Sequence, residues 1–228
     1  MIRLVFALSL ALALLSASRA NADFALAEAA YLQGDYETAL REFHPLAEQG
    51  DARAQARLGF IYYQGDGVPQ DFAKAIIWLR KAAQQGNAPA QARLGEAYHW
   101  GRGVPQDDEI AADFYRAAAE RNHTHAQTML AELYAYGQGV AQDDAEALMW
   151  CRKAAEQGYP LAQTALGFIY AQGKGAAQDF VKALMWSNLA QAQDDFMAAM
   201  FREHLVFRMS DEQIAEAERL TREWQPAP

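Results

Sequence analysis

DARAQARLGFIYYQGDGVPQDFAKAIIWLRKAAQQG, residues 51–86, is the first of four copies of one pattern that follow each other without insertion or deletion. Equivalent residues recur every 36 positions, as from Gln55 to Gln91. A fixed period of this length is typical of repeat proteins, in which each repeat is one supersecondary unit. The recurring positions include Gln55, Gln91, Gln127 and Gln163; Leu58, Leu94, Leu130 and Leu166; Tyr62, Tyr98, Tyr134 and Tyr170; Gly65, Gly101, Gly137 and Gly173; and Asp71, Asp107, Asp143 and Asp179.

Each repeat is predicted to contain two helices. In repeat one the first helix is expected over residues 52–64, because apolar residues recur there at helical spacing. Gly65 can adopt the left-handed conformation that ends a helix, and residues 67–69 then form a turn. Asp71 is a suitable N-cap for a second helix that runs to about Gln85. The inner faces are expected to carry Ala54, Leu58, Ile61 and Tyr62 on the first helix, and Ala75, Trp78, Leu79 and Ala82 on the second.

A helix pair cannot bury its apolar face alone, so stacked repeats predict an all-α solenoid. Residues 29–50 resemble a helix pair with a shorter turn, which we expect to cap the first repeat. Ser210 opens a capping-box pattern for a last helix through about Trp224, with Ile214, Ala217 and Leu220 on one face. The predicted domains are residues 23–50, repeats at 51–86, 87–122, 123–158 and 159–193, and C-terminal capping helices and tail at 194–228.

The N-terminus has the three parts of a secretory signal peptide. Met1-Ile2-Arg3 is a short positive start, residues 4–15 are apolar, and the small-residue pattern Ala20-Asn21-Ala22 follows. The apolar run is about 12 residues long, whereas a transmembrane helix needs about 20. We therefore expect residues 1–22 to be removed after Ala22, leaving a periplasmic or secreted protein without a membrane span.

Composition excludes several classes of function. The chain has 20 Lys and Arg against 29 Asp and Glu, a formal net charge of -9. A net acidic chain is a poor general nucleic-acid binder, because phosphate contacts need clustered cations. A single cysteine excludes an intramolecular disulfide framework and a multi-cysteine zinc site. We predict no metal, no cofactor and no catalytic residues.

The repeat pattern closely resembles the Sel-one-like repeat (SLR) family, a relative of the TPR repeats. The matching pattern is A-x-A-Q-x-x-L-G-x-x-Y-x-x-G-x-G-V-x-Q-D, followed by K-A-x-x-W and K-A-A-x-Q-G. The resemblance implies a right-handed superhelix that acts as an adaptor or scaffold for protein complexes. A cysteine-rich, disulfide-bonded subset of exported family members binds or hydrolyses β-lactams. This chain lacks their paired cysteines, so the resemblance does not imply that activity here.

Comparison of the four copies predicts a binding surface. Positions 54, 55, 58, 59, 61 and 62 of repeat one are alike in all copies, whereas positions 53, 56, 57, 60, 63 and 64 vary. At about 100° per residue the two sets lie on opposite sides of the first helix. The variable side is rich in aromatic residues and arginine, which are enriched in binding hot spots. The predicted groove for a protein or peptide comprises Arg57, Phe60, Arg93, Glu96, Trp100, Met129, Glu132, Tyr136 and Phe168.

Within this groove, Arg57 and Arg93 are expected to hold acidic groups, and Phe60, Trp100 and Tyr136 to give apolar anchors. Two other functional classes stay open: an envelope hydrolase acting on a cell-wall or β-lactam-like substrate, and a module that binds a carbohydrate or small ligand. The oligomeric state is open as well.

Four other features have structural explanations. The Gly173-Lys174-Gly175 turn lacks the strand–loop–helix context of a phosphate loop. His123 and His125 lack further metal ligands nearby in sequence, and the equivalence of Glu96 and Glu132 follows from the repeat. Cys151 is expected to be a semi-buried thiol.

Overall fold

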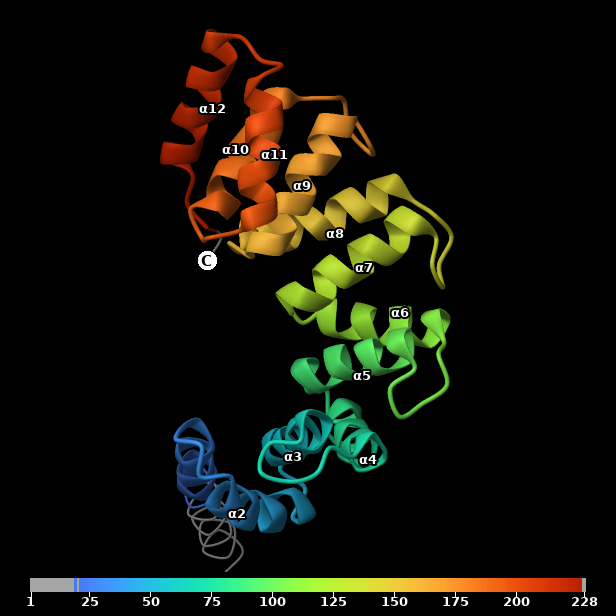
Figure 1. Cartoon of the computed structure of the whole chain (residues 1–228). Helices are drawn as coiled ribbons and strands as arrows, with labels where there is room; N and C mark the ends of the chain where they lie inside the picture. The colour runs from blue at the N-terminus through green and yellow to red at the C-terminus, as the bar shows by residue number, and fades with distance from the viewer. Residues whose placement is uncertain (1–18, 20, 227–228) are drawn as a thin grey trace, which may run out of the picture. The chain divides into compact units, whose positions relative to one another are not determined.

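The computed structural model describes residues 19 and 21–226, and within them the chain forms helices joined by turns and loops, without strands (Figure 1). Residues 1–18 and 20, which hold most of the predicted signal peptide, lie outside the described residues. Residues 21–32 are helical. The helices that follow are α2 Tyr36–Glu48, α3 Ala52–Gln64, α4 Phe72–Gln84, α5 Ala88–Trp100, α6 Asp108–Ala119, α7 Thr124–Tyr136, α8 Asp144–Glu156, α9 Pro160–Gln172, α10 Phe180–Gln191, α11 Phe196–Val206 and α12 Asp211–Glu223.

The predicted helix limits of repeat one are confirmed by α3 and α4. Gly65 ends α3 with a left-handed φ of 84°. The Asp71 carboxylate accepts the Lys74 backbone N–H at 2.9 Å and so caps α4. Ser210 and Gln213 form the predicted capping box of α12. The caps succeed as sequence signals because each satisfies backbone groups that a helix end leaves unpaired.

The chain divides into two compact units, and the division falls within α5. Unit one contains the described residues up to Ala97 together with Arg102–Pro105. Unit two contains Tyr98–Gly101 and the described residues from Gln106 onward. In each unit, consecutive helices pack on one another, as α3 does on α2 and α4, and α9 on α8 and α10. This packing of consecutive helix pairs is typical of a helical repeat solenoid.

The invariant glutamine of the repeat is a buried inter-repeat link. Gln127 is fully buried, and its Nε2 donates to the carbonyl of Ala119, at the end of the preceding repeat's second helix, at 3.1 Å. Its Oε1 accepts from Gln157 Nε2 at 2.9 Å. Gln163 makes the same pair of bonds, with Ala155 and Gln193. Buried polar side chains need such partners, so the constant glutamine is explained by stacking alone.

The first helix does not present the predicted faces at its last turn. Tyr62 was placed in the core but is half-buried, because its hydroxyl reaches His44 of the preceding helix at 3.2 Å. The equivalent Tyr170 reaches Arg152 at 2.8 Å. Tyr63, predicted to be exposed, is 4% exposed and packs edge-on against Phe72.

Two further burial predictions need correction. Ala56, also on the side that was predicted to be exposed, is buried at 4% exposure. Trp78 is half-buried against the core of unit one, with the Lys81 ammonium 4.2 Å from the centre of its ring. The fully buried residue of that turn is Leu79. Truncation of Trp78 to alanine therefore leaves a smaller cavity than truncation of a fully buried aromatic residue. It should lower the free energy of unfolding by less than the loss of about 3–5 kcal/mol typical of such a residue.

The second glycine of each turn has a packing role. Gly139 follows α7 with a φ of 65°, and a Cβ there would overlap the carbonyl group of Asp108 at the start of α6. A Cβ on Gly175 would overlap the carbonyl oxygen of Asp144 at the start of α8. Each turn thus approaches the N-terminus of the preceding repeat's second helix at backbone contact distance. Only glycine fits, because both the conformation and the space exclude a side chain.

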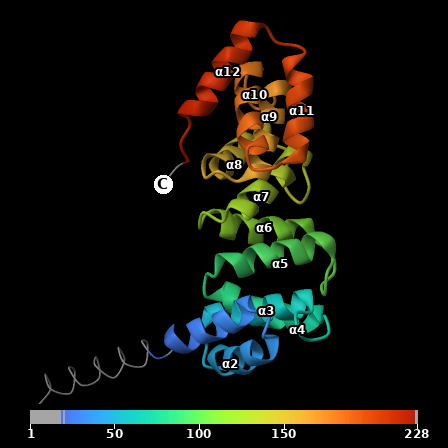
Figure 2. The ribbon, with the colours of Figure 1, turned by 60° about the vertical axis from the view of Figure 1, so that its left-hand side comes forward.

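The C-terminal part ends in two helices that pack on α10, namely α11 and α12 (Figure 2). Ala217 of α12 is buried, whereas Ile214 and Leu220 are half-buried. Trp224 packs edge-on against Trp186 with ring centres 6.0 Å apart. Among the described residues, none of the helices combines the length and apolar character needed to cross a bilayer.

Candidate functional site

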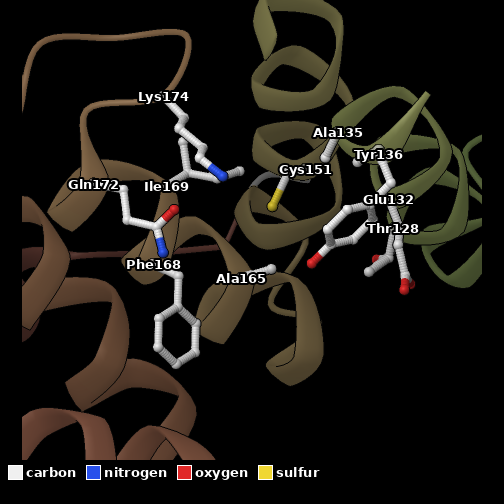
Figure 3. Close-up of a pocket in the computed structure, with 11 residues that line it drawn as sticks. Thr128, Glu132, Ala135, Tyr136, Cys151, Ala165, Phe168, Ile169, Gln172 and Lys174 are labelled. Atoms are coloured by element: carbon white, nitrogen blue, oxygen red, sulfur yellow. The ribbon is translucent and has the colours of Figure 1, made fainter. Parts of the chain in front are cut away.

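A pocket of about 370 Å³ lies in unit two between repeats three and four (Figure 3). Its walls come from α7, α8 and α9, and the turn after α9 contributes Lys174. Three residues of the predicted groove line it: Glu132, Tyr136 and Phe168. The other lining residues are Thr128, Ala131, Ala135, Cys151, Ala165, Ile169, Gln172 and Lys174.

The pocket exists because three small side chains coincide in the repeat register. Ala135, Cys151 and Ala165 come from α7, α8 and α9 and all line it. One repeat earlier the same three positions hold larger side chains, and two repeats earlier they do so again. These larger residues are His99, Tyr115 and Met129 one repeat earlier, and Tyr63, Leu79 and Arg93 two repeats earlier. Packed interiors leave few voids, so simultaneous loss of bulk at three positions opens a cavity.

Unit one shows how the equivalent place is filled. Arg93 lies over the rings of Phe60 and Tyr63, with its guanidinium carbon 5.5 and 5.1 Å from their centres. Its Nη1 donates to Glu96 at 2.5 Å. Arg102, which occupies the position of Lys174, donates to the Tyr63 hydroxyl at 3.5 Å. Stacked and charge-paired side chains therefore occupy the space that is open between repeats three and four.

The two arginines predicted to hold a partner's acidic groups already have acidic partners within the chain. Arg57 pairs with Glu28 of the N-terminal helix and lies 5.5 Å from the centre of the Tyr31 ring. Arg93 pairs with Glu96, as described above. Arg57 and Phe60 do line a second hollow of about 260 Å³ in unit one. An acidic ligand there would compete with the existing ion pair, which makes this hollow the weaker candidate.

The remaining predicted residues are placed differently from one another. Trp100 is 60% exposed at the end of α5, with its ring edge-on to His99 at 4.5 Å between centres. Met129 is half-buried on α7 and does not line the pocket. Phe168 lines the pocket and also contacts Phe201 of α11, with ring centres 3.9 Å apart. Tyr136 is 70% exposed at the edge of the pocket.

Comparison of the four repeat sequences did not identify the small residues that leave the pocket open, or the lysine that places a positive charge beside it. Ala135 and Ala165 carry no functional group, so their signal is the loss of size at positions where other repeats have large residues. Lys174 was considered only as part of a phosphate loop, whereas its side chain extends toward the pocket (Figure 3). Cys151 was expected to be semi-buried but is 1% exposed.

Burial and a hydrogen bond both lower the reactivity of the Cys151 thiol in the folded protein. Its Sγ donates to the Ala162 carbonyl oxygen at 3.3 Å, and burial raises its pKa to about 12. The thiolate, which is the reactive form, is therefore scarce at neutral pH.

We expect Cys151 to resist a thiol reagent such as DTNB at pH 8 in the native chain and to react rapidly in urea. Because its pKa is higher in the folded than in the unfolded state, the associated stability is present below pH 9. It is lost as the pH rises toward 12. Absorbance at 412 nm follows the reaction, and rapid native labelling would contradict the burial.

The histidines have structural partners. His99 is the repeat-two equivalent of Tyr63 and so belongs to the variable positions predicted to be exposed. It is 8% exposed, and its Nδ1 lies 2.7 Å from the Asp108 carboxylate. His123 accepts the Ala126 backbone N–H at 3.2 Å and so caps α7. His125 Nδ1 lies 3.2 Å from the Tyr159 hydroxyl. Within the described residues no cluster of three or more His, Cys, Asp or Glu could hold a metal ion.

The chain matches a protein-family model described as Sel1 repeat. The family model matches residues 52–87, 88–123, 124–159 and 160–195, which is more than half of the 228 residues. No curated protein is significantly similar to the chain.

Solved structures share the fold. A Sel1 repeat protein from Oxalobacter formigenes is 29% identical with a TM-score of 0.77, over 88% of this chain and 82% of that protein. The antigen c5321 of uropathogenic Escherichia coli, described as having an SLR fold, is 29% identical with a TM-score of 0.59. That match covers 90% of this chain but 53% of c5321, so the chain spans about half of that protein's length. The immunity protein Pa5087 of Pseudomonas aeruginosa is 23% identical with a TM-score of 0.54, over 90% of this chain and 79% of that protein, and it shows the fold alone.

Proposed function

The chain belongs to the Sel1 repeat family, and we propose that it is an exported, non-enzymatic scaffold that binds a segment of a partner protein in the pocket between repeats three and four. Sel1 repeats generally mediate protein–protein interaction. The proposal assigns the interaction to one place in unit two. It replaces the longer predicted groove by the three groove residues that line this pocket: Glu132, Tyr136 and Phe168.

The observation that carries the proposal is the combination of an open apolar cavity with an exposed aromatic at its edge. The pocket is walled by alanines, Ile169 and Phe168, and Tyr136 is 70% exposed beside it. Tyrosine is enriched in binding hot spots, and hot spots cluster in pockets that desolvate an anchor residue. The volume of about 370 Å³ lies within the range of about 300–1,000 Å³ for ligand pockets.

Export to the cell envelope is the second part of the proposal, and it rests on the N-terminal sequence. Met1-Ile2-Arg3, the apolar residues 4–15 and the Ala20-Asn21-Ala22 pattern together fit a cleaved signal peptide. A scaffold of this kind would meet its partner outside the cytoplasm.

Site-specific photo-crosslinking tests the proposal in the cells that normally produce the protein. Benzoylphenylalanine replaces Tyr136, an aromatic-for-aromatic exchange, and the matched control carries it at Arg222, an exposed position on α12. We expect a discrete protein adduct from position 136, recovered with the extracytoplasmic fraction, and no such adduct from position 222.

The same experiment in an Ala165→Met background shows whether the pocket is responsible. Loss of the adduct from position 136 in that background is the expected result. An adduct of equal yield with the pocket filled would overturn the assignment of the site, and recovery of the adduct only from the cytoplasm would overturn export.

A further inference from the structure

We propose that the pocket recognises a linear peptide segment in which one large apolar residue lies between an acidic residue and a basic residue. This inference rests on the proposed function and adds the chemistry of the partner segment. Three features of the pocket carry it: the size and polarity of its interior, the ammonium group of Lys174, and the carboxylate of Glu132.

The interior selects one large apolar side chain. Its apolar walls are alanine, isoleucine and phenylalanine, joined by Gln172 and by Thr128, whose hydroxyl already donates to the Thr124 carbonyl. Its volume of about 370 Å³ is near the lower end of the range for ligand pockets, about 300–1,000 Å³. Cys151 lines it as well, but the thiol proton is already donated to the Ala162 carbonyl. The pocket interior is therefore suited to an aromatic or long aliphatic side chain, because its alanine, isoleucine and phenylalanine walls offer no hydrogen-bond partner to a buried polar group.

Lys174 supplies a cation at one edge of the pocket. It lies in the exposed turn after α9, and Figure 3 shows its side chain extending toward the pocket. Among the described residues no carboxylate forms an ion pair with it. By contrast Lys182, on the next helix, is paired with Asp179 at 3.1 Å. The group complementary to Lys174 is therefore a carboxylate supplied by the partner.

Glu132 supplies an anion at the opposite edge (Figure 3). One repeat earlier the equivalent Glu96 is neutralised by Arg93, three residues before it on the same helix. Three residues before Glu132 the chain has Met129, so the cation of that internal pair is missing. Glu132 is exposed and has no ion pair within the described residues. Its complement is a basic residue of the partner.

The two charges together also give the segment its orientation. An apolar residue in the pocket places its neighbours on one side near Lys174 and on the other near Glu132. Like charges brought together at an interface cost affinity, so a segment with two acidic or two basic flanks binds more weakly than one with an acidic and a basic flank. Tyr136, exposed beside Glu132 on α7, offers a ring face to the same basic residue.

Selection from a phage-displayed library of random dodecapeptides tests the inference with the purified chain. Peptides that also bind Ala165→Met are removed, which leaves those that depend on the pocket. We expect the remaining peptides to carry Phe, Leu, Met or Trp with Asp or Glu within two residues on one side and Lys or Arg on the other.

A charge reversal at Lys174 provides the discriminating measurement. Lys174→Glu makes both edges of the pocket acidic and, on an exposed turn, leaves the fold intact. A synthetic peptide with one acidic and one basic flank should bind this variant about tenfold more weakly than the native chain, and its all-basic counterpart about tenfold more tightly. Lys174→Met should lose the preference for the acidic flank without gaining one for a basic flank.

The two possible failures are distinguishable. Pocket-dependent peptides without charged flanks, or with unchanged flanks after selection on Lys174→Glu, would overturn the inference and leave the proposed function standing. If the native chain and Ala165→Met select the same peptides, or neither selects any, both the inference and the assignment of the pocket are wrong.

Discussion

Gly139→Ala is expected to lower the free energy of unfolding by about 3 kcal/mol, because two costs act together. The new Cβ would overlap the carbonyl group of Asp108, at the start of α6. Forcing extra atoms into a packed region costs about 1–3 kcal/mol. The φ of 65° adds the cost of a left-handed conformation for an L-residue, about 1–2 kcal/mol. Urea unfolding followed by circular dichroism measures the change.

Gly158→Ala is the matched control in the same unit. Gly158 also has a left-handed φ, of 87°, but a Cβ there would meet only Trp224, at 3.8 Å. This variant should lose about 1–2 kcal/mol, the conformational cost alone. Equal losses for the two variants would show that contact between the turn and the preceding repeat does not contribute to stability.

Ala165→Met is expected to weaken binding of the partner segment about 100-fold. Methionine stands at the equivalent position, Met129, in repeat three, and at position 165 its side chain would occupy the pocket. The partner's anchor residue would then stay in water and lose about 1.5–3 kcal/mol of burial, where each 1.4 kcal/mol is about tenfold in affinity. Isothermal titration calorimetry with a pocket-dependent peptide from the library provides the measurement.

Ala165→Ser is the control for this second prediction, because it changes the same residue without filling the space. Its affinity should stay within about threefold of the native value, a difference below about 0.7 kcal/mol. Unfolding in urea should show both variants close to the native chain in stability, since Ala165 is half-buried and faces a cavity. A native-like affinity for a folded Ala165→Met would show that the partner binds elsewhere.

The helices could be predicted from the sequence because the repeat marks both ends of each one. Asp71 caps α4 and Gly65 ends α3 where the sequence places them. Four copies of the same pattern also show which positions stacking requires. The bonds of Gln127 to Ala119 and Gln157 explain why that glutamine does not vary.

The inward direction of position 63 could not be predicted, because variation between repeats was interpreted as exposure. Tyr63 packs on Phe72, and the equivalent His99 bonds to Asp108, so the two members of the pair change together. A buried position can therefore vary when its partner varies with it. Comparison of single positions does not reveal this coupling.

The pocket could be predicted only in part. Glu132, Tyr136 and Phe168 were selected as variable residues of the first helices, and the structure brings them together. Ala135 and Ala165 could not be selected, because their contribution is the volume that they leave empty. Recognising it requires knowing that positions on three helices converge, which is a property of the tertiary structure.

Methyl NMR of the chain, titrated with a pocket-dependent peptide, tests most directly whether the partner segment binds between repeats three and four. Ile169 and Ala165 report on the pocket, whereas Ile61 and Ala56 are buried in unit one and report on that unit. Saturable shifts at the Ile169 and Ala165 methyl groups, with the Ile61 and Ala56 signals unchanged, are the predicted result. Shifts that cluster at Ile61 and Ala56 while the pocket methyl groups stay unchanged would show that the partner segment does not bind between repeats three and four.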